Sequence, residues 1–280
     1  MARGSRERAE RLVAVTRRLV SEPGRMHSLP ALGMETGVAK STLSEDLDLI
    51  DRVFQREGGG AIETVVGAQG GVRYTPKMRP AEIRRDLEEL CRELSQPGRV
   101  VAGSFLYVTD VVFSPRWSHR IGRIFAALFY RKSPSVVVTV ETKGIPIALM
   151  TAYHLGVPLA VARRESRVTE GPSLSFTYVS GSRQHIASMY LPRRALPEEG
   201  RAVVVDDFLK GGGTAKALTE MIREFGVEVA DVGVFMDSPE PATKLWNDYV
   251  ALLRLVSVAE DEVSVVLAPS LLARLEDDPS

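Results

Sequence analysis

The sequence lacks the features that mark several large classes of protein. Its 280 residues hold a single cysteine, Cys91, so no disulfide forms within the chain, and we expect a reducing compartment such as the cytoplasm. No apolar run approaches the roughly 18 residues needed to span a membrane, so no membrane partner is expected. The histidines show no metal-site spacing, and no metal ligands are predicted; they are His27, His119, His154 and His185.

Common catalytic motifs are missing as well. The phosphate-loop pattern GxxxxGK[ST] does not occur, since Lys216 follows Ala215 rather than a glycine. The sequence contains no GxGxxG dinucleotide motif and no serine in a GxSxG turn. These absences disfavour nucleoside triphosphatases, dinucleotide-dependent enzymes and α/β-hydrolases, and no catalytic residue is assigned.

The formal charge of the chain is zero, but it is unevenly distributed. Residues 1–80 carry thirteen Lys and Arg against ten Asp and Glu, and residues 1–27 carry seven arginines against three glutamates. A basic segment favours a nucleic-acid partner, although surface arginines are common in other proteins too.

Residues 1–78 show three helical patterns followed by a β-hairpin. An apolar stripe with arginines outside it predicts the first helix. The stripe comprises Ala9, Leu12, Val13, Thr16, Leu19 and Val20, and the outer arginines are Arg6, Arg11, Arg17 and Arg18. Ser28 is the expected N-cap of a short second helix carrying Leu29, Ala31, Leu32 and Met34, and Gly37 permits the turn that follows.

The third helix is predicted from the stripe Leu43, Leu47, Ile50 and Phe54. Thr42 and Glu45 form a capping box at its start, or the helix begins one turn earlier. Its outward face begins with small or basic donors, whereas Glu45, Asp46 and Asp48 count against DNA contact by its later turns. Two β-prone runs, 62–66 and 72–74, flank Gly67-Ala68-Gln69-Gly70-Gly71, which predicts a hairpin.

A charged helix from Pro80 to Ser95, closed by Pro97-Gly98, is interpreted as a linker. From residue 99 strands alternate with helices: strands are expected at 135–141, 157–162, 202–206, 229–235 and 263–267, and helices at 117–130, 146–155 and 214–225. This order predicts a parallel sheet covered on both faces, with a ligand beyond the carboxyl ends of its strands. Residues 165–200, polar and without a helical pattern, are expected to form an inserted β-ribbon or flap.

One segment combines a buried strand, two carboxylates and a glycine-rich entry into a helix: Val203-Val204-Val205-Asp206-Asp207-Phe208-Leu209-Lys210-Gly211-Gly212-Gly213-Thr214-Ala215. Carboxylates suit the hydroxyls of a ligand, and N–H groups at a helix start suit a phosphate. Together they describe a site for a ribose 5-phosphate. A solvated strand–helix connection without a ligand is the alternative.

This segment resembles the motif with which type I phosphoribosyltransferases bind phosphoribosyl pyrophosphate (PRPP). The resemblance implies that Asp206 and Asp207 bind the ribose hydroxyls and that the loop holds the 5′-phosphate; the expected site is Asp206, Asp207, Phe208, Leu209, Lys210, Gly211, Gly212, Gly213, Thr214 and Ala215. Glu141-Thr142-Lys143-Gly144 resembles the pyrophosphate loop of the family and adds Thr142, Lys143 and Gly144. Enzymes of the family commonly carry Thr or Ser where this chain has Gly211, which removes a hydroxyl from the phosphate site.

Residues 37–44 resemble the turn and recognition helix of a winged helix-turn-helix. The residues expected to contact DNA are Lys40, Ser41, Thr42, Ser44, Arg6, Arg17 and Arg73. The two halves together resemble the purine operon repressors of Gram-positive bacteria over nearly the whole chain, and residues 163–171 and 178–182 are similar to the flap of that family.

The resemblance implies a homodimer that represses purine synthesis and transport genes and lacks phosphoribosyltransferase activity. Operator DNA and PRPP are the expected partners, with Mg²⁺ on the diphosphate but no required cofactor. A purine nucleotide polyphosphate, which also carries phosphates and a ribose diol, is a candidate competitor for the cleft.

The sequence therefore predicts an α/β protein with three parts. These are a winged helix-turn-helix domain at 1–78, a linker helix at 79–98, and a type I phosphoribosyltransferase-like domain at 99–280. The last domain has a central parallel sheet and is expected to bind the effector and to dimerise. Two rivals stay open: a working purine phosphoribosyltransferase with an N-terminal regulatory domain, and a dimerising regulator whose partner is another protein.

Overall fold

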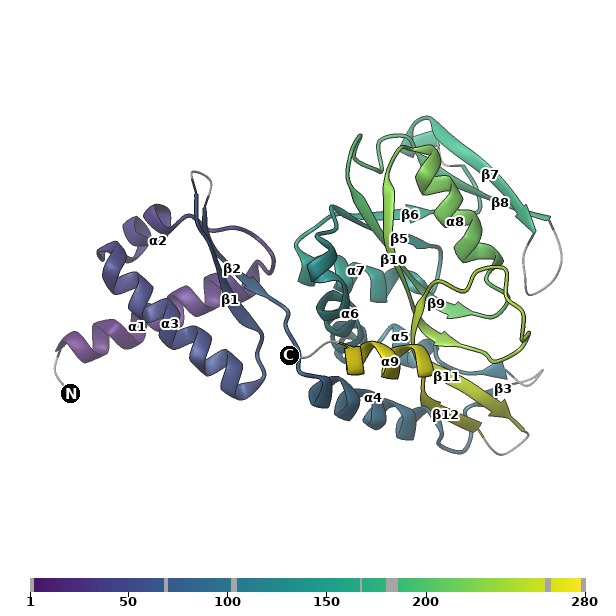
Figure 1. Ribbon diagram of the computed structural model, residues 1–280, viewed down its shortest axis with the longest axis horizontal. Coiled ribbons are helices and arrows are strands. Elements are labelled where there is room, and N and C mark those ends of the chain that lie inside the picture. The colour runs from purple at the N-terminus through teal and green to yellow at the C-terminus, as the bar shows by residue number, and fades with distance from the viewer. Residues whose placement is uncertain are drawn as a thin grey trace. The chain divides into compact units, whose positions relative to one another are not determined.

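The computed structural model describes residues 3–67, 70–101, 105–166, 168–179, 186–259 and 263–277. The chain divides into two compact units (Figure 1). One is Met1–Arg79, with which Tyr153–Gly156 are grouped, and the other is Pro80–Ala152 together with Val157–Ser280. Each unit has its own hydrophobic core. None of the helices in the described parts of the chain is both long and apolar enough to cross a membrane.

The first unit consists of three helices followed by an antiparallel hairpin (Figure 1). Its elements are α1 (Arg3–Ser21), α2 (Leu29–Thr36), α3 (Lys40–Glu57), β1 (Ala61–Val65) and β2 (Gly71–Thr75). His27, between α1 and α2, adds an antiparallel bridge to Val72. The core of this unit is formed by Val15, Leu19, Leu32, Leu43, Leu47, Ile50, Val72 and Tyr74. This order of elements is a winged helix-turn-helix. The predicted hairpin turn lies partly outside the described residues, at 68–69.

The buried face of α1 differs from the predicted one. Val15 and Leu19 are buried, whereas Val13 is 69% exposed and Val20 is 40% exposed. The prediction that Arg11 lies outside was also wrong, since its side chain is only 14% exposed. Helical periodicity locates a stripe but does not show that part of the contact between α1 and α3 is ionic.

The ionic contact between these helices centres on Asp46 of α3, whose side chain is completely buried. Its two oxygens accept hydrogen bonds from Arg8 Nε at 3.0 Å and Arg11 Nε at 2.6 Å, both on α1. The carboxylate was expected to oppose DNA on the outer face of α3. It instead turns inward, where it pairs with two arginines of α1.

Helix α2 starts where the sequence predicted. Helix α3 starts one turn before Thr42, which was the alternative to a capping box. Ser28 Oγ accepts a hydrogen bond from Ala31 N at 3.2 Å, which confirms the N-cap. The turn after α2 contains Gly37 in the left-handed conformation, at φ 68°. Helix α3 begins at Lys40, a turn earlier than a capping box would place it, and no side chain caps it. The prediction of a capping box was therefore wrong.

The apolar side of α2 was predicted too broadly. Leu32 alone is fully buried in this helix, while Met34 is 80% exposed. The stripe of α3 is confirmed, because Leu43, Leu47 and Ile50 are buried and Phe54 packs against the same cluster.

The second unit is built around a six-stranded sheet (Figure 1). The sheet order is β12-β11-β10-β9-β5-β6, with β12 antiparallel and the others parallel. The strands are β5 (Val136–Val140), β6 (Leu159–Ala162), β9 (Arg201–Leu209), β10 (Glu228–Asp237), β11 (Val250–Val258) and β12 (Val263–Leu267). Strand β11 was not predicted, because its apolar run has no period that separates a strand from a buried helix.

Helices cover both faces of this sheet. Val232 and Val234 of β10 share a core cluster with α8 (Gly213–Glu224), whereas the intervening Gly233 faces Phe125 of α6 (Pro115–Phe129). Because alternate residues of a strand point to opposite faces, α8 and α6 lie on opposite sides of β10. The remaining helices are α4 (Pro80–Leu94), α5 (Thr109–Val112), α7 (Gly144–Leu155) and α9 (Pro269–Asp277), with short 3-10 helices at Tyr130–Lys132 and Val168–Glu170.

Two small ribbons complete the unit. Strands β3 (Val100–Val101) and β4 (Phe105–Leu106) pair antiparallel near its start. Strands β7 (Ser173–Val179) and β8 (Ile186–Pro192) also pair antiparallel, which confirms the β-ribbon predicted within residues 165–200. Residues 167 and 180–185 of the flap lie outside the described part of the chain.

Helix α4, interpreted from the sequence as a linker, packs into the second unit. It buries Glu82, Ile83, Leu87, Leu90 and Leu94 and lies against β11 and β12.

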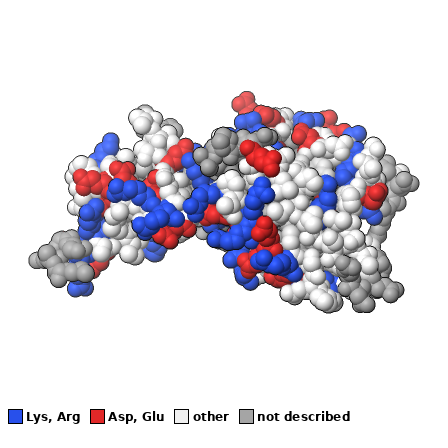
Figure 2. All heavy atoms as spheres, turned by 60° about the horizontal axis from the view of Figure 1, so that its bottom comes forward, with Lys and Arg blue, Asp and Glu red and all other residues white. Residues whose placement is uncertain are grey.

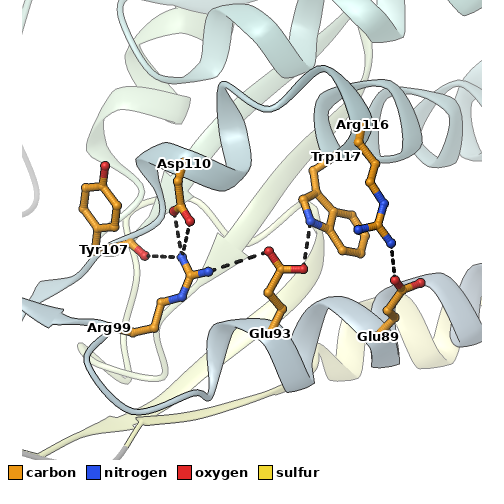
Figure 3. A network of polar contacts seen from close by, with 7 residues as sticks. All are labelled: Glu89, Glu93, Arg99, Tyr107, Asp110, Arg116 and Trp117. Carbon is orange, nitrogen blue, oxygen red and sulfur yellow. Dashed lines mark hydrogen bonds and ion pairs between the residues drawn. The ribbon is translucent and has the colours of Figure 1, made fainter.

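Polar contacts add to this attachment of α4 (Figure 3). Of the contacts drawn there, Glu89 accepts a hydrogen bond from Arg116, and Glu93 accepts one from Trp117 Nε1 at 3.0 Å. Glu89 also accepts one from Arg120 at 2.8 Å. The guanidinium groups of Arg116 and Arg120 lie 4.9 and 5.2 Å from the Trp117 ring centroid.

Candidate functional site

The carboxyl ends of β5, β6 and β9 meet at one edge of the sheet. The segment Glu141–Gly144 follows β5, Arg163 and Arg164 follow β6, and Asp206 and Asp207 lie near the end of β9. Strand β5 pairs with both β6 and β9, so these three sets of polar residues come from neighbouring strands. The fold thus places the predicted acidic pair and the predicted pyrophosphate loop side by side.

Asp206 lies in an unfavourable environment for a charged carboxylate. Its side chain is half-buried, and its Oδ1 accepts a hydrogen bond from the Asp207 N–H at 2.9 Å. Desolvation, followed by repulsion from the adjacent Asp207 carboxylate, raises the pKa of Asp206 well above its usual range, while Arg164 opposes the shift. Such a carboxylate readily accepts hydrogen bonds from a ligand that replaces the lost water.

Gly144 brings the loop after β5 into contact with Asp206. A Cβ atom at this position would lie 2.6 Å from Thr139 Oγ1 and 2.9 Å from Asp206 Oδ1. Thr139 is fully buried and cannot readily move aside. Only glycine therefore lets the first turn of α7 approach the carboxylate so closely.

Glu141 connects the loop to the end of β6. Its Oε1 accepts a hydrogen bond from the Arg164 N–H at 2.8 Å, and its Oε2 lies 3.6 Å from Arg163 Nη1. Arg163 also donates to Glu170 at 2.7 Å. The peptide bond between Glu141 and Thr142 is cis. These contacts fix the loop backbone, while the side chains of Thr142 and Lys143 remain exposed.

The glycine-rich loop after β9 lines a hollow of about 450 Å³, its solvent-open mouth included. Helix α8 starts at Gly213, and Gly212 precedes it in the left-handed conformation (φ 76°) without a side-chain cap. The uncapped helix start leaves backbone N–H groups and the positive end of the helix dipole for an anion. The lining residues are Asp206, Phe208, Leu209, Lys210, Gly211, Gly212, Gly213, Thr214, Ala215 and Val234.

Most of the predicted PRPP-site residues thus share one pocket. Asp207, Thr142, Lys143 and Gly144 do not line it; Gly144 instead touches Asp206 at its edge. Sequence reasoning missed Val234 and also the segment Lys244–Trp246, which contacts the glycine loop from outside. No local motif marks that segment, because its partners lie more than thirty residues away.

The N-terminal unit places its predicted contact residues on the surface in most cases. Lys40 and Ser41 are exposed at the start of α3, Thr42 is half-exposed, and Ser44 Oγ bonds back to the Lys40 carbonyl at 3.0 Å. Arg17 is exposed. Two of the predicted arginines are already paired with acids, Arg6 with Glu10 at 3.0 Å and Arg73 with Glu63 at 2.8 Å.

Basic and acidic side chains are interspersed over the first unit, as the face drawn in Figure 2 shows. A group of three His, Cys, Asp or Glu side chains able to hold a metal ion is not found among the described residues.

Fold and site define a two-part protein, in which a winged helix-turn-helix unit precedes a phosphoribosyltransferase-type unit with a pocket lined by a glycine-rich loop. Residues 7–76 match the family described as bacterial purine repressor, N-terminal, and residues 115–269 match the phosphoribosyl transferase domain family. The chain is 36% identical over 258 residues to the purine biosynthesis transcriptional repressor PurR of Bacillus subtilis, covering 92% of this chain and 90% of that protein. The chain belongs to the bacterial purine repressor family.

Other relatives show two further features of the family. The purine biosynthesis transcriptional activator PurR of Lactococcus lactis subsp. lactis is 38% identical over 266 residues, 93% of this chain and 97% of that protein. Xanthine phosphoribosyltransferase of Geobacillus thermodenitrificans is 34% identical over 172 residues, 60% of this chain and 86% of that protein. The family thus contains proteins named as repressors and proteins named as activators. The second unit of this chain is also related to an enzyme.

Solved structures support the fold of the second unit. Adenine phosphoribosyltransferase of Rhodothermus marinus superimposes with a TM-score of 0.51 at 18% identity, covering 61% of this chain and 99% of that one. The corresponding enzyme of Thermoanaerobacter pseudethanolicus gives 0.50 at 19% identity, covering 60% and 99%. The predicted fold class, a winged helix-turn-helix followed by a phosphoribosyltransferase-like sheet domain, is confirmed.

Proposed function

We propose that the chain is a DNA-binding transcriptional repressor of purine synthesis and transport genes, released from its operator by PRPP. The observation that carries the proposal is the pocket formed by Asp206 and the loop Phe208–Ala215, in a chain that also contains a winged helix-turn-helix. Similarity to named purine regulators over more than nine-tenths of the chain supports the gene class.

Each part of PRPP has a counterpart at this site. The ribose 2′- and 3′-hydroxyls donate to Asp206 and Asp207, and the 5′-phosphate accepts from the N–H groups at the start of α8. The diphosphate lies against Thr142, Lys143 and Gly144, of which Gly144 adjoins Asp206. Mg²⁺ would accompany PRPP as the counter-ion of the diphosphate, and we assign no protein ligand to it.

On the DNA side, α3 presents Lys40, Ser41, Thr42 and Ser44 to the major groove, as recognition helices do. Arg6 and Arg17 of α1 and Arg73 of the hairpin contact phosphates. A homodimer places two such units on one operator.

For PRPP to release the protein from DNA, PRPP must bind the DNA-free protein more tightly than the DNA-bound protein. A tenfold loss of operator affinity corresponds to a difference of about 1.4 kcal/mol. The test titrates PRPP with Mg²⁺ into the complex of full-length protein and promoter DNA from purine genes, followed by fluorescence anisotropy. We expect the DNA to be released; unchanged operator affinity at saturating PRPP would refute the proposal.

The same titration includes a purine nucleotide polyphosphate. This compound offers phosphates and a ribose diol to the same pocket, so we expect it to compete with PRPP and to leave the protein on DNA. In vitro transcription from the same promoter then determines the sign of regulation. A rise in transcription on addition of the protein would identify an activator, as the relative from Lactococcus lactis is named.

The second candidate function is phosphoribosyl transfer, favoured by the similarity to xanthine phosphoribosyltransferase. We propose that this chain lacks the activity, because the relatives that it matches over most of its length are named transcriptional regulators. Gly211, which supplies no hydroxyl where enzymes of the type commonly carry Thr or Ser, supports the proposal. The assay measures pyrophosphate release from PRPP and Mg²⁺ with a panel of purine bases. Release above the level of an Asp206→Asn variant would establish an enzyme.

A further inference from the structure

The connection between β10 and β11, residues 238–249, lies against the outside of the glycine loop. We name it the clamp segment. Ser238 N donates to the Leu209 carbonyl at 3.1 Å, and Leu245 N donates to the Gly211 carbonyl at 2.8 Å. Between them, Lys244 Nζ donates to the Lys210 carbonyl at 2.7 Å. Three consecutive carbonyls of the loop are therefore held from one side.

This pattern determines where the loop amides point. The C=O and the following N–H of a trans peptide group point in opposite directions. When the carbonyls of Leu209, Lys210 and Gly211 face the clamp segment, the N–H groups of Lys210, Gly211 and Gly212 face away from it. Consecutive N–H groups with a common direction form an anion-binding concavity, and all three residues line the pocket.

Lys244 is the side chain that completes this arrangement. Besides the Lys210 carbonyl, its ammonium group donates to the Ser238 carbonyl at 2.6 Å, so it joins the loop to the start of the clamp segment. Burial lowers the pKa of Lys244, with Asp237 and Glu240 opposing the shift and Arg254 adding to it. Trp246 packs closely against the loop at Gly212, where a Cβ atom would lie only 2.8 Å from Trp246 N.

The clamp segment is itself anchored at both ends by a buried ionic contact. Asp237, the last residue of β10, is fully buried and accepts hydrogen bonds from Arg254 Nε at 2.9 Å and Arg254 Nη2 at 2.6 Å. It also accepts one from the Tyr249 hydroxyl at 3.0 Å. The segment therefore starts and ends at fixed points, and Lys244 lies between them.

We infer that Lys244 is a positioning residue for the anion site: it holds the glycine loop in the conformation that binds the 5′-phosphate, without touching the ligand itself. The inference rests on the proposed function of the pocket and deepens it. Preorganised donors bind an anion more tightly than donors that must be ordered at the moment of binding. Losing Lys244 should therefore weaken the binding of any ribose 5-phosphate group and loosen the loop even without ligand.

The experiment measures the binding of PRPP and ribose 5-phosphate to the full-length protein by calorimetry. Lys244→Met, which keeps the length of the side chain but removes its donors, should weaken both ligands about tenfold or more. Lys244→Arg, which restores donors to the carbonyls, should remain within about threefold of the wild type. The matched control is Lys216→Met, which removes an exposed cation on α8 and should leave both affinities unchanged.

Hydrogen exchange of the unliganded variants supplies the second readout. In Lys244→Met, exchange should accelerate at the amides of Ser238 and Leu245, which donate to the loop carbonyls, while the β5 and β9 amides keep their protection. Where the methionine variant does not fold, Lys244→Gln is measured in its place and decides alone.

Three results would overturn the inference: wild-type affinity in Lys244→Met, an equal loss in Lys216→Met, or accelerated exchange throughout the unit. Failure of the wild type to bind either ligand would instead refute the proposed function, so the two failures are distinguishable.

Discussion

At the scale of single residues, the site is built from a carboxylate that the fold itself disfavours. Asp206 is desolvated and lies beside a second carboxylate, which together raise its pKa. A residue with raised native pKa binds more protons in the folded state than in the unfolded state, so its contribution to stability decreases as pH rises above the unfolded value of about 3.9. The acid is kept despite this cost, as expected for a binding residue.

Asp206→Asn should therefore stabilise the protein while impairing the site. The amide keeps the Oδ1 atom that accepts from Asp207 N, but it removes the charge repulsion. We expect the melting temperature of the variant to exceed that of the wild type at pH 8, with the difference shrinking toward pH 4. PRPP affinity should fall at least about tenfold.

Scanning calorimetry and a PRPP titration check both halves of this prediction. The control is Glu224→Gln, which also replaces a carboxylate by an amide but at an exposed position at the end of α8. It should change neither the melting temperature nor the PRPP affinity. A variant that melts below the wild type at pH 8 would contradict it.

The second prediction at this scale concerns Asp46 of the N-terminal unit. Removing one partner of a buried ionic contact typically costs about 3 kcal/mol, and Asp46 accepts from both Arg8 and Arg11. Asp46→Asn should lower the free energy of opening of α1 and α3, measured by hydrogen exchange. Asp48→Asn, exposed on the same helix, should not.

At the scale of secondary-structure elements, α3 is the element that we assign to base recognition. Lys40 is exposed at its first turn, where a recognition helix meets DNA. Lys40→Ala should weaken operator binding and reduce the slope of log affinity against log salt by about 1, if the ammonium neutralises one phosphate. Arg56→Ala, at the other end of α3, is the control and should leave the slope unchanged. Anisotropy titrations at several salt concentrations measure the operator affinity and its salt dependence. Equal slopes for Lys40→Ala and the wild type would show that Lys40 does not neutralise a DNA phosphate.

Elements whose signals are local could be predicted from sequence. The strand, acidic pair and glycine turn at 203–215 are contiguous, so the location of the pocket followed from one segment. The inward turn of Asp46 could not be foreseen, because its partners are 35 and 38 residues away. Lys244 was missed for the same reason, since its contact with Lys210 spans 34 residues and depends on sheet order.

At the scale of the whole molecule, α4 follows the N-terminal unit in the sequence and is anchored in the second unit (Figure 3). Glu89 is one anchor: it accepts a hydrogen bond from Arg116, as Figure 3 shows, and another from Arg120. Glu89→Gln should leave PRPP affinity unchanged, because the pocket lies on other elements. It should reduce the factor by which PRPP lowers operator affinity, because α4 is then held less firmly.

Comparing operator titrations with and without PRPP tests this coupling. Glu88→Gln, a neighbouring acid on the same helix, is the control. If PRPP lowers the operator affinity of Glu89→Gln as much as that of the wild type, the Glu89 contacts do not transmit the signal.

The raised pKa of Asp206 also couples ligand binding to the protonation of this carboxyl group. Ribose hydroxyls donate hydrogen bonds and so favour the ionised carboxylate, which means that binding lowers the pKa of Asp206 and, at a pH near or below the raised pKa of the free protein, releases protons to the solution. The heat of PRPP binding should then vary with the ionisation enthalpy of the buffer, and affinity should fall as the solution is acidified. If the proposed PRPP site is correct, the release of DNA therefore depends on pH as well as on the concentration of PRPP.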